Sequence, residues 1–162
     1  SIVKFFENEG YEFIKWKDSC KELFFIEDNL TKKKPNKVSL KNLNKGLQVY
    51  STIGKLDLSQ SIIIQNNIVL GIEAAEGTDE LIRRCFKYKK KGDKGILIKL
   101  SKYYQDFRFD IPVIGLHTLK QLKKYDYEGV FLEKEKCIII DKDKVIDFCN
   151  QSSLFISGVN KF

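Results

Sequence analysis

Gly95-Ile-Leu-Ile98 leads directly into Lys99-Leu-Ser-Lys102-Tyr-Tyr-Gln105-Asp106-Phe-Arg108-Phe-Asp110-Ile-Pro112. The short apolar run predicts a buried strand, and the run behind it places cations, carboxylates and an amide close together. Carboxylates bind Mg²⁺, and Lys or Arg offsets the charge of phosphoryl oxygens, so this mixture suits a site for a metal ion and a phosphate. The alternative is a solvated loop, because charge runs are commonly only solvated.

The chain beyond this stretch carries apolar patterns of both helical and strand type. Three leucines recur at helical spacing, whereas the later apolar runs are short and continuous. The predicted elements are a helix over 116–125, a strand pair at 130–132 and 137–140 joined across 133–136, a short helix capped by Asp141, and a strand over 154–159.

The chain before the stretch predicts further helices and a hairpin. Two apolar runs flank Asn66-Asn67, residues that tolerate positive φ, and therefore predict a β-hairpin over 61–73. Before the hairpin we expect a helix over 2–9 that Gly10 stops, a strand over 11–16 and a polar linker over 27–37. A helix capped by Ser39 follows the linker and ends at Gly54, with an apolar stripe at Leu40, Leu43, Leu47 and Tyr50. After the hairpin we expect a helix capped by Thr78, with its apolar face at Leu81, Ile82, Cys85 and Phe86. This irregular alternation predicts an α/β or α+β fold, a mixed sheet with flanking helices.

Size and composition are those of an ordinary globular protein. The 162 residues are 43% hydrophobic and 31% charged, enough for one domain or for one domain plus part of another. No apolar stretch approaches the ~18 residues of a membrane span, and the start carries no signal-peptide pattern. The net charge of +7 favours a nucleic acid, an anionic membrane surface or a phosphorylated ligand, or reflects compositional bias alone.

Cysteine and histidine usage argues against a zinc site. Four scattered cysteines form no CxxC pair, and His117 is the only histidine. The cysteines have apolar neighbours, which predicts reduced thiols in the core of a cytoplasmic protein. His117 is expected at a half-buried or surface position of its helix.

A second polar cluster precedes the helix that Thr78 is expected to cap. It reads Glu73-Ala-Ala-Glu76-Gly77-Thr78-Asp79, between a strand and a helix whose amino end offers N–H groups to an anion. Gly77 would let the backbone approach a ligand closely. The alternative is an ordinary capped helix with acids that complement its dipole. No P-loop, dinucleotide-binding or nucleophile-elbow motif occurs.

Taken together, these pieces resemble a known family, the LpxI-type UDP-2,3-diacylglucosamine pyrophosphatases of lipid A biosynthesis. Their order, spacing and length agree from about Leu30 to the end of the chain. The resemblance implies that residues 1–29 are the tail of an N-terminal domain and that residues 30–162 are a C-terminal catalytic and lipid-binding domain, so that the chain is a fragment of a two-domain protein. The matching pieces are Gly54–Gln60, Glu73–Asp79 with Arg83-Arg84, Lys99, Lys102, Gln105–Pro112, Gly115 and Leu154–Val159.

The resemblance also implies an activity and residue roles. The family hydrolyses the pyrophosphate of UDP-2,3-diacylglucosamine to UMP and 2,3-diacylglucosamine 1-phosphate with Mg²⁺, and Asp110 falls on its essential aspartate. The expected catalytic residues are Asp110, Asp79 and Gln105. The residues expected to bind substrate are Lys99, Lys102, Arg108, Gly77 and Thr78. The expected metal ligands are Asp110 and Glu76.

Partners follow from the same resemblance. They are the lipid substrate and its product, the absent N-terminal domain on which activity is expected to depend, and a second copy in a homodimer; nucleic acid is not expected. A cytoplasmic protein, peripheral at the inner membrane, is implied. The alternatives are a non-enzymatic, basic nucleic-acid-binding module, suggested by the lysines at 32–34 and 87–94, and a degenerate domain kept for dimer contacts.

Overall fold

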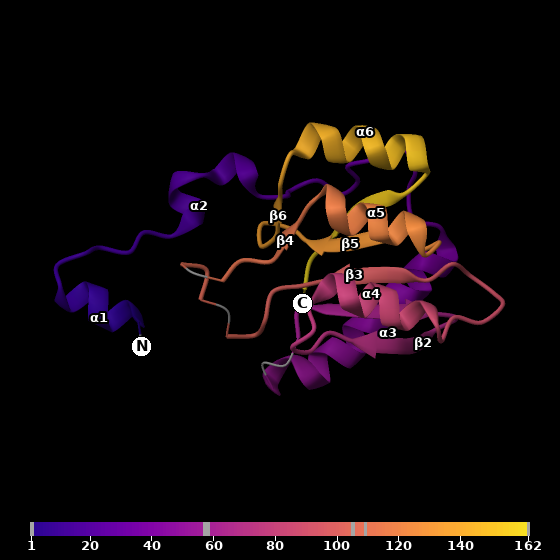
Figure 1. Ribbon diagram of the computed structural model, residues 1–162, viewed down its shortest axis with the longest axis horizontal. Helices are drawn as coiled ribbons and strands as arrows, with labels where there is room; N and C mark the ends of the chain where they lie inside the picture. Colours follow the sequence, from indigo (N-terminus) through magenta and orange to yellow (C-terminus); the bar gives the residue numbers. More distant parts are fainter. Residues whose placement is uncertain (1, 57–58, 105, 109, 162) are drawn as a thin grey trace.

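The chain is built around a five-stranded mixed sheet with helices on both faces (Figure 1). The computed structural model describes residues 2–56, 59–104, 106–108 and 110–161. In the strand order β2-β1-β3-β5-β7, β1 is antiparallel to β2 and β3, whereas β3, β5 and β7 are parallel. This sheet confirms the predicted mixed α/β class. The strands are β1 (Ser61–Gln65), β2 (Ile68–Ile72), β3 (Ile96–Lys99), β5 (Gly129–Glu133) and β7 (Phe155–Val159).

Side-chain alternation along the strands divides the core into two layers. Ile96 and Ile98 of β3 pack with Leu43 of α3 on one face. Leu97, between them, packs with α4, α5 and α6 on the other face. The helices are α1 (Ile2–Asn8), α2 (Trp16–Ser19), α3 (Lys37–Ile53), α4 (Thr78–Phe86), α5 (Leu116–Lys124) and α6 (Lys142–Ser152), with 3₁₀ turns at Lys21–Leu23 and Gly54–Leu56.

Strand direction brings both polar clusters of the sequence to one edge of the sheet. Ser61 at the start of β1 pairs with Lys99 at the end of β3, and Ile72 at the end of β2 pairs with Ile62. The loop after β2 therefore leads into α4 from the same edge at which the stretch after β3 begins. Open α/β sheets commonly bind ligands outside the carboxyl ends of their parallel strands.

The predicted strand pair at 130–132 and 137–140 is wrong. β5 lies inside the main sheet between β3 and β7, where it is buried throughout. Residues 137–140 contribute β6 (Ile138–Ile139), which pairs in parallel with β4 (Val113–Ile114) in a small second sheet. Two apolar runs separated by four residues resemble a hairpin locally, but here each run finds its partner far away in sequence.

The N-terminal part also departs from the sequence prediction. Residues 11–15 form no strand and lead into the short helix α2. The expected linker at 27–37 packs against β7, because Leu30 N donates to Ile156 O at 3.0 Å and Gly158 N to Asp28 O at 2.9 Å. Figure 1 shows α1 and α2, in indigo, to one side of the sheet.

Local signals were more accurate for turns and helix ends than for single cap residues. The hairpin is confirmed, with positive φ at Asn66 and Asn67. The α3 cap is Asn36 instead of Ser39, since Asn36 Oδ1 accepts from the backbone N–H groups of residues 38 and 39. Thr78 is the first residue of α4, and Gly77 occupies the cap position with φ 80°.

Two side chains assigned to apolar helix faces lie at the surface. Leu40 of α3 is 45% exposed and Phe86 of α4 is 47% exposed. The prediction for the thiols fits better, because all four cysteines are free and all but Cys20 are buried. None of the described helices is both long enough and apolar enough to cross a bilayer.

Candidate active site

Lys99 and Ser61 lie opposite each other at the sheet edge described above. Lys99 follows Leu97 by two residues, so its side chain faces the side of the sheet on which α4 packs. Its Nζ donates to Thr78 Oγ1 at 2.8 Å and lies 3.5 Å from Ser61 Oγ. Because Lys99 is only 5% exposed, these hydroxyls replace water around a buried ammonium group.

The Thr78 hydroxyl connects this ammonium group to the carboxylate of Glu73. Thr78 Oγ1 donates to Glu73 Oε1 at 2.9 Å and lies 3.2 Å from Ser61 Oγ. A hydroxyl has a single hydrogen, so Thr78 must accept from both Lys99 and Ser61 while it donates to Glu73. The network therefore joins a cation to an anion through one hydroxyl and holds Glu73 at the start of α4.

A cavity of about 220 Å³ opens beside Glu73. The second oxygen of Glu73, Oε2, is shielded from solvent and has no hydrogen-bond partner within the described part of the chain. Leaving a buried acceptor unpaired costs on the order of 1–3 kcal/mol, so this oxygen is an unusual feature. The residues that line the cavity are Ser59, Gln60, Glu73, Ala74, Lys102 and Asp110.

Asp110 brings a second carboxylate to the same cavity. Gln60 Nε2 lies 3.4 Å and 3.3 Å from the two carboxylate oxygens of Asp110. The backbone N–H of Asp110 donates to the carbonyl of Asp106 at 3.0 Å, which closes a turn before Pro112. Asp110 itself is exposed, so its carboxylate is accessible to a ligand.

This donor set fits Mg²⁺. The ion prefers oxygen ligands, and proteins commonly supply it with one or two carboxylates while substrate phosphates and water complete the shell. The side chains of Asp110 and Glu73, both carboxylates, line the cavity. No cluster of three or more His, Cys, Asp or Glu side chains suited to a metal occurs among the described residues.

Gly77 directly precedes Thr78, whose hydroxyl belongs to this network. The φ of 80° at Gly77 lies in the left-handed region, which favours glycine. A Cβ at this position would meet no atom within 4 Å, so the backbone here borders open space.

Glu76 and Asp79 point to other partners. Glu76 accepts from the guanidinium of Arg84 at 2.9 Å and 2.7 Å. A hydrogen bond from its own backbone amide, followed by that from Arg84, lowers the pKa of Glu76 below its ordinary value. Asp79 accepts from Thr118 Oγ1 at 2.8 Å and lies 3.4 Å from His117 Nε2, so its carboxylate connects α4 to α5.

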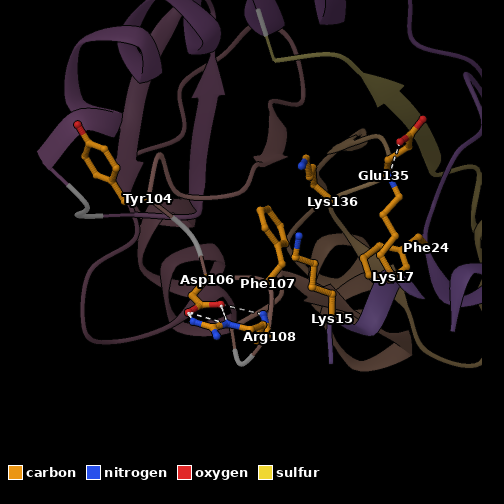
Figure 2. A pocket seen from close by; sticks show the side chains of 9 residues that line it. All are labelled: Lys15, Lys17, Phe24, Tyr104, Asp106, Phe107, Arg108, Glu135 and Lys136. Atoms are coloured by element: carbon orange, nitrogen blue, oxygen red, sulfur yellow. Dashed lines mark hydrogen bonds and ion pairs between the residues drawn. The ribbon is translucent and has the colours of Figure 1, made fainter. Parts of the chain in front are cut away.

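Arg108 lines a larger cavity of about 540 Å³, shown in Figure 2, which Asp110 and Glu73 do not line. Its guanidinium makes a two-point contact with Asp106, which lowers the pKa of that carboxylate, and lies 3.4 Å from Glu7 of α1. Lys136 Nζ lies 4.4 Å from the centre of the Phe107 ring in the same cavity. Arg108 is thus associated with the N-terminal segment, and Gln105 falls outside the described residues.

A third cavity, of about 270 Å³, lies beside the 220 Å³ cavity that contains Asp110 and shares Lys102 with it. Glu133 at the end of β5 accepts from the backbone and hydroxyl of Ser101, at 2.7 Å each. Lys161 Nζ donates to Ser101 O at 2.7 Å, and burial lowers the pKa of this lysine. The two neighbouring cavities therefore form one polar region that meets at Lys102.

Sequence reasoning missed three side chains that the fold brings to the site. Glu73 and Gln60 belong to quoted motifs but received no role, and Ser61 appeared only as the start of a strand. The signal for Ser61 was available in principle, because a polar residue that begins a buried strand lies at the sheet edge. The unpaired state of Glu73 Oε2 could not be inferred without the fold.

These features define a class: an α/β protein with a mixed acidic and basic site, suited to a metal ion and phosphate groups, at the carboxyl edge of its sheet. Residues 27–157 match the family described as LpxI C-terminal domain, and the chain belongs to this family. The chain is similar to UDP-2,3-diacylglucosamine pyrophosphatase LpxI of Caulobacter vibrioides, with 29% identity over 98% of the chain. The chain spans 59% of that relative's length.

Proposed function

We propose that the chain forms the catalytic part of a hydrolase that cleaves the pyrophosphate of UDP-2,3-diacylglucosamine with water. The products are UMP and 2,3-diacylglucosamine 1-phosphate, and Mg²⁺ is required. The observation that carries this proposal is the cavity in which two carboxylates and Lys102 meet at the sheet edge. Membership in the LpxI C-terminal domain family supports it further.

The roles of the residues follow from their positions. Asp110 is the exposed carboxylate of the cavity and would hold Mg²⁺, which would polarise the phosphoryl oxygens. Lys102 lies between the two neighbouring cavities, where its charge offsets the negative charge that develops on the diphosphate. Lys99 does not line the cavity; it acts through Thr78 to position Glu73.

The experiment is an assay of UMP release from UDP-2,3-diacylglucosamine. Both the 162-residue chain and the complete product of its gene are tested with Mg²⁺ and with a chelator. The proposal expects equal amounts of UMP and lipid phosphate, formed only with Mg²⁺. Release of UDP would mean that the glycosidic bond is cleaved instead, and release of neither nucleotide by the complete product would overturn the proposal.

Two lysines of the basic connector at 87–94, on which the alternative of a nucleic-acid-binding module partly rests, are engaged within the fold. Lys89 Nζ donates to the backbone oxygens of Tyr125 and Asp126, and Lys94 forms an ion pair with Asp126 at 2.7 Å. These lysines therefore help to fold the loop before β3. A titration of RNA and DNA binding at low salt tests the alternative, and measurable affinity that falls steeply with salt would favour it.

A further inference from the structure

We infer that Glu73 is the second carboxylate ligand of the divalent cation, beside Asp110, and that Lys99 and Thr78 hold it in place. The inference rests on the proposed function, since that function supplies the need for Mg²⁺. It gives Glu73 the role of metal ligand that the sequence predicts for Glu76.

The two carboxylate oxygens of Glu73 are paired unequally. Oε1 accepts from Thr78, whereas Oε2 is shielded from solvent and has no partner among the described residues. A carboxylate in this state is stabilised by any cation that reaches Oε2. Glu73 lines the same cavity as Asp110, so the two carboxylates belong to one site.

The other acids near α4, Glu76 and Asp79, have partners outside the cavity. The Glu76 carboxylate accepts from Arg84 and from the backbone N–H of Ala74. The Asp79 carboxylate is engaged by Thr118 and His117 of α5. Neither residue lines the cavity, so Glu73 and Asp110 are the acids that do so in the described part of the chain.

The charged groups in and behind the cavity balance one another. Glu73 and Asp110 are matched by two ammonium groups, that of Lys102 in the cavity and that of Lys99 behind Thr78. Without a metal these four groups together have no net charge. A divalent cation between the two carboxylates makes the site positive, which suits an anionic substrate.

The test compares Glu73→Gln with Glu76→Gln in a titration with MnCl₂, without lipid substrate. Free Mn²⁺ is followed by electron paramagnetic resonance, with and without UMP, and the melting temperature is recorded. Gln at position 73 retains an acceptor for Thr78 but loses the charge. We expect Glu73→Gln to weaken Mn²⁺ binding by about tenfold or more and to lose the Mn²⁺-dependent rise in melting temperature. Glu76→Gln is expected to bind Mn²⁺ like the wild type.

Two results would overturn the inference: wild-type affinity in Glu73→Gln, or no Mn²⁺ binding by the wild type even with UMP. If Glu73→Gln fails to fold, Glu73→Asp replaces it. Asp retains the charge but shortens the reach, so weaker Mn²⁺ binding is again expected, and unchanged binding would contradict the inference. Since no lipid substrate is present, loss of UMP release in the separate assay overturns the proposed function alone.

Discussion

At the scale of single residues, the hydroxyl of Thr78 determines how the site is ordered. It is the contact through which the buried ammonium group of Lys99 reaches the carboxylate of Glu73. A buried cation and a buried anion are both costly unless they are hydrogen-bonded. Loss of this one hydroxyl therefore leaves both charges poorly paired.

Thr78→Val removes the hydroxyl but retains the branched shape. We expect this variant to lose about 1–3 kcal/mol in the free energy of unfolding, because charged groups in the network lose a partner. Urea denaturation measures the loss. Thr78→Ser keeps the hydroxyl and is the matched control, with stability close to the wild type. Equal stability of the Val and wild-type proteins would show that the network is not needed.

Much of the site could be predicted at this scale, but not how its residues pair. The charged residues after β3 and the cluster at 73–79 were singled out from residue type and order, and the fold brings both to one edge. Which acids face the cavity depends on the orientation of single side chains. Glu73 and Glu76 are three residues apart, and only tertiary contacts with Thr78 and Arg84 distinguish them.

At the scale of elements, the contact between β7 and the segment at 27–31 depends on Gly158. A Cβ built on Gly158 would lie 2.3 Å from the backbone oxygen of Glu27 and 2.7 Å from Lys134 Cγ. The backbone oxygen is fixed by the neighbouring bond from Gly158 N to Asp28 O at 2.9 Å. A side chain at this position therefore forces the segment away from β7.

Gly158→Ala is expected to lower the free energy of unfolding by about 1–3 kcal/mol, the usual cost of overpacking. Urea denaturation measures the effect, and amide hydrogen exchange at Leu30 should become faster, because its N–H bonds to Ile156. Asn160→Ala, two residues further on at an exposed position just after β7, is the control and should change stability by no more than about 0.5 kcal/mol. A fully stable Gly158→Ala protein would contradict the close approach.

Elements were predicted well where the signal is local and poorly where pairing is distant. Asn66-Asn67 predicts the hairpin at 61–73, and its turn forms as expected, with positive φ at both residues. β6 was assigned to β5 because the two runs are adjacent in sequence, whereas its partner β4 lies beyond a whole helix. Parallel pairing requires such a crossover, and no pattern within one segment reports it.

At the scale of the whole molecule, the buried thiols make stability depend on pH. Burial raises the pKa of Cys85 to about 11 and that of Cys137 and Cys149 to about 12. In the unfolded chain a thiol ionises near pH 8.5. The folded state must keep these groups neutral, so their contribution to stability is complete below about pH 8.5 and is lost as the pH rises toward 11–12.

We therefore expect the free energy of unfolding, measured in urea with a reductant, to fall steeply between about pH 9 and pH 11. Each thiol adds a slope of up to about 1.4 kcal/mol per pH unit. Cys149→Ala should reduce this slope by the contribution of one thiol, up to about 1.4 kcal/mol per pH unit. An identical slope in the wild type and Cys149→Ala would exclude the buried thiols as the cause.

The central claim is that the cavity at the sheet edge, with Asp110 in it, performs the hydrolysis. The most direct measurement is the rate of UMP release by Asp110→Ala in the complete gene product with Mg²⁺, after circular dichroism has shown that the variant is folded. Asp147→Ala, an exposed position on α6, is the matched control. The account predicts a loss of about 10²-fold or more for Asp110→Ala and none for the control. A folded Asp110→Ala protein with the wild-type rate would contradict it.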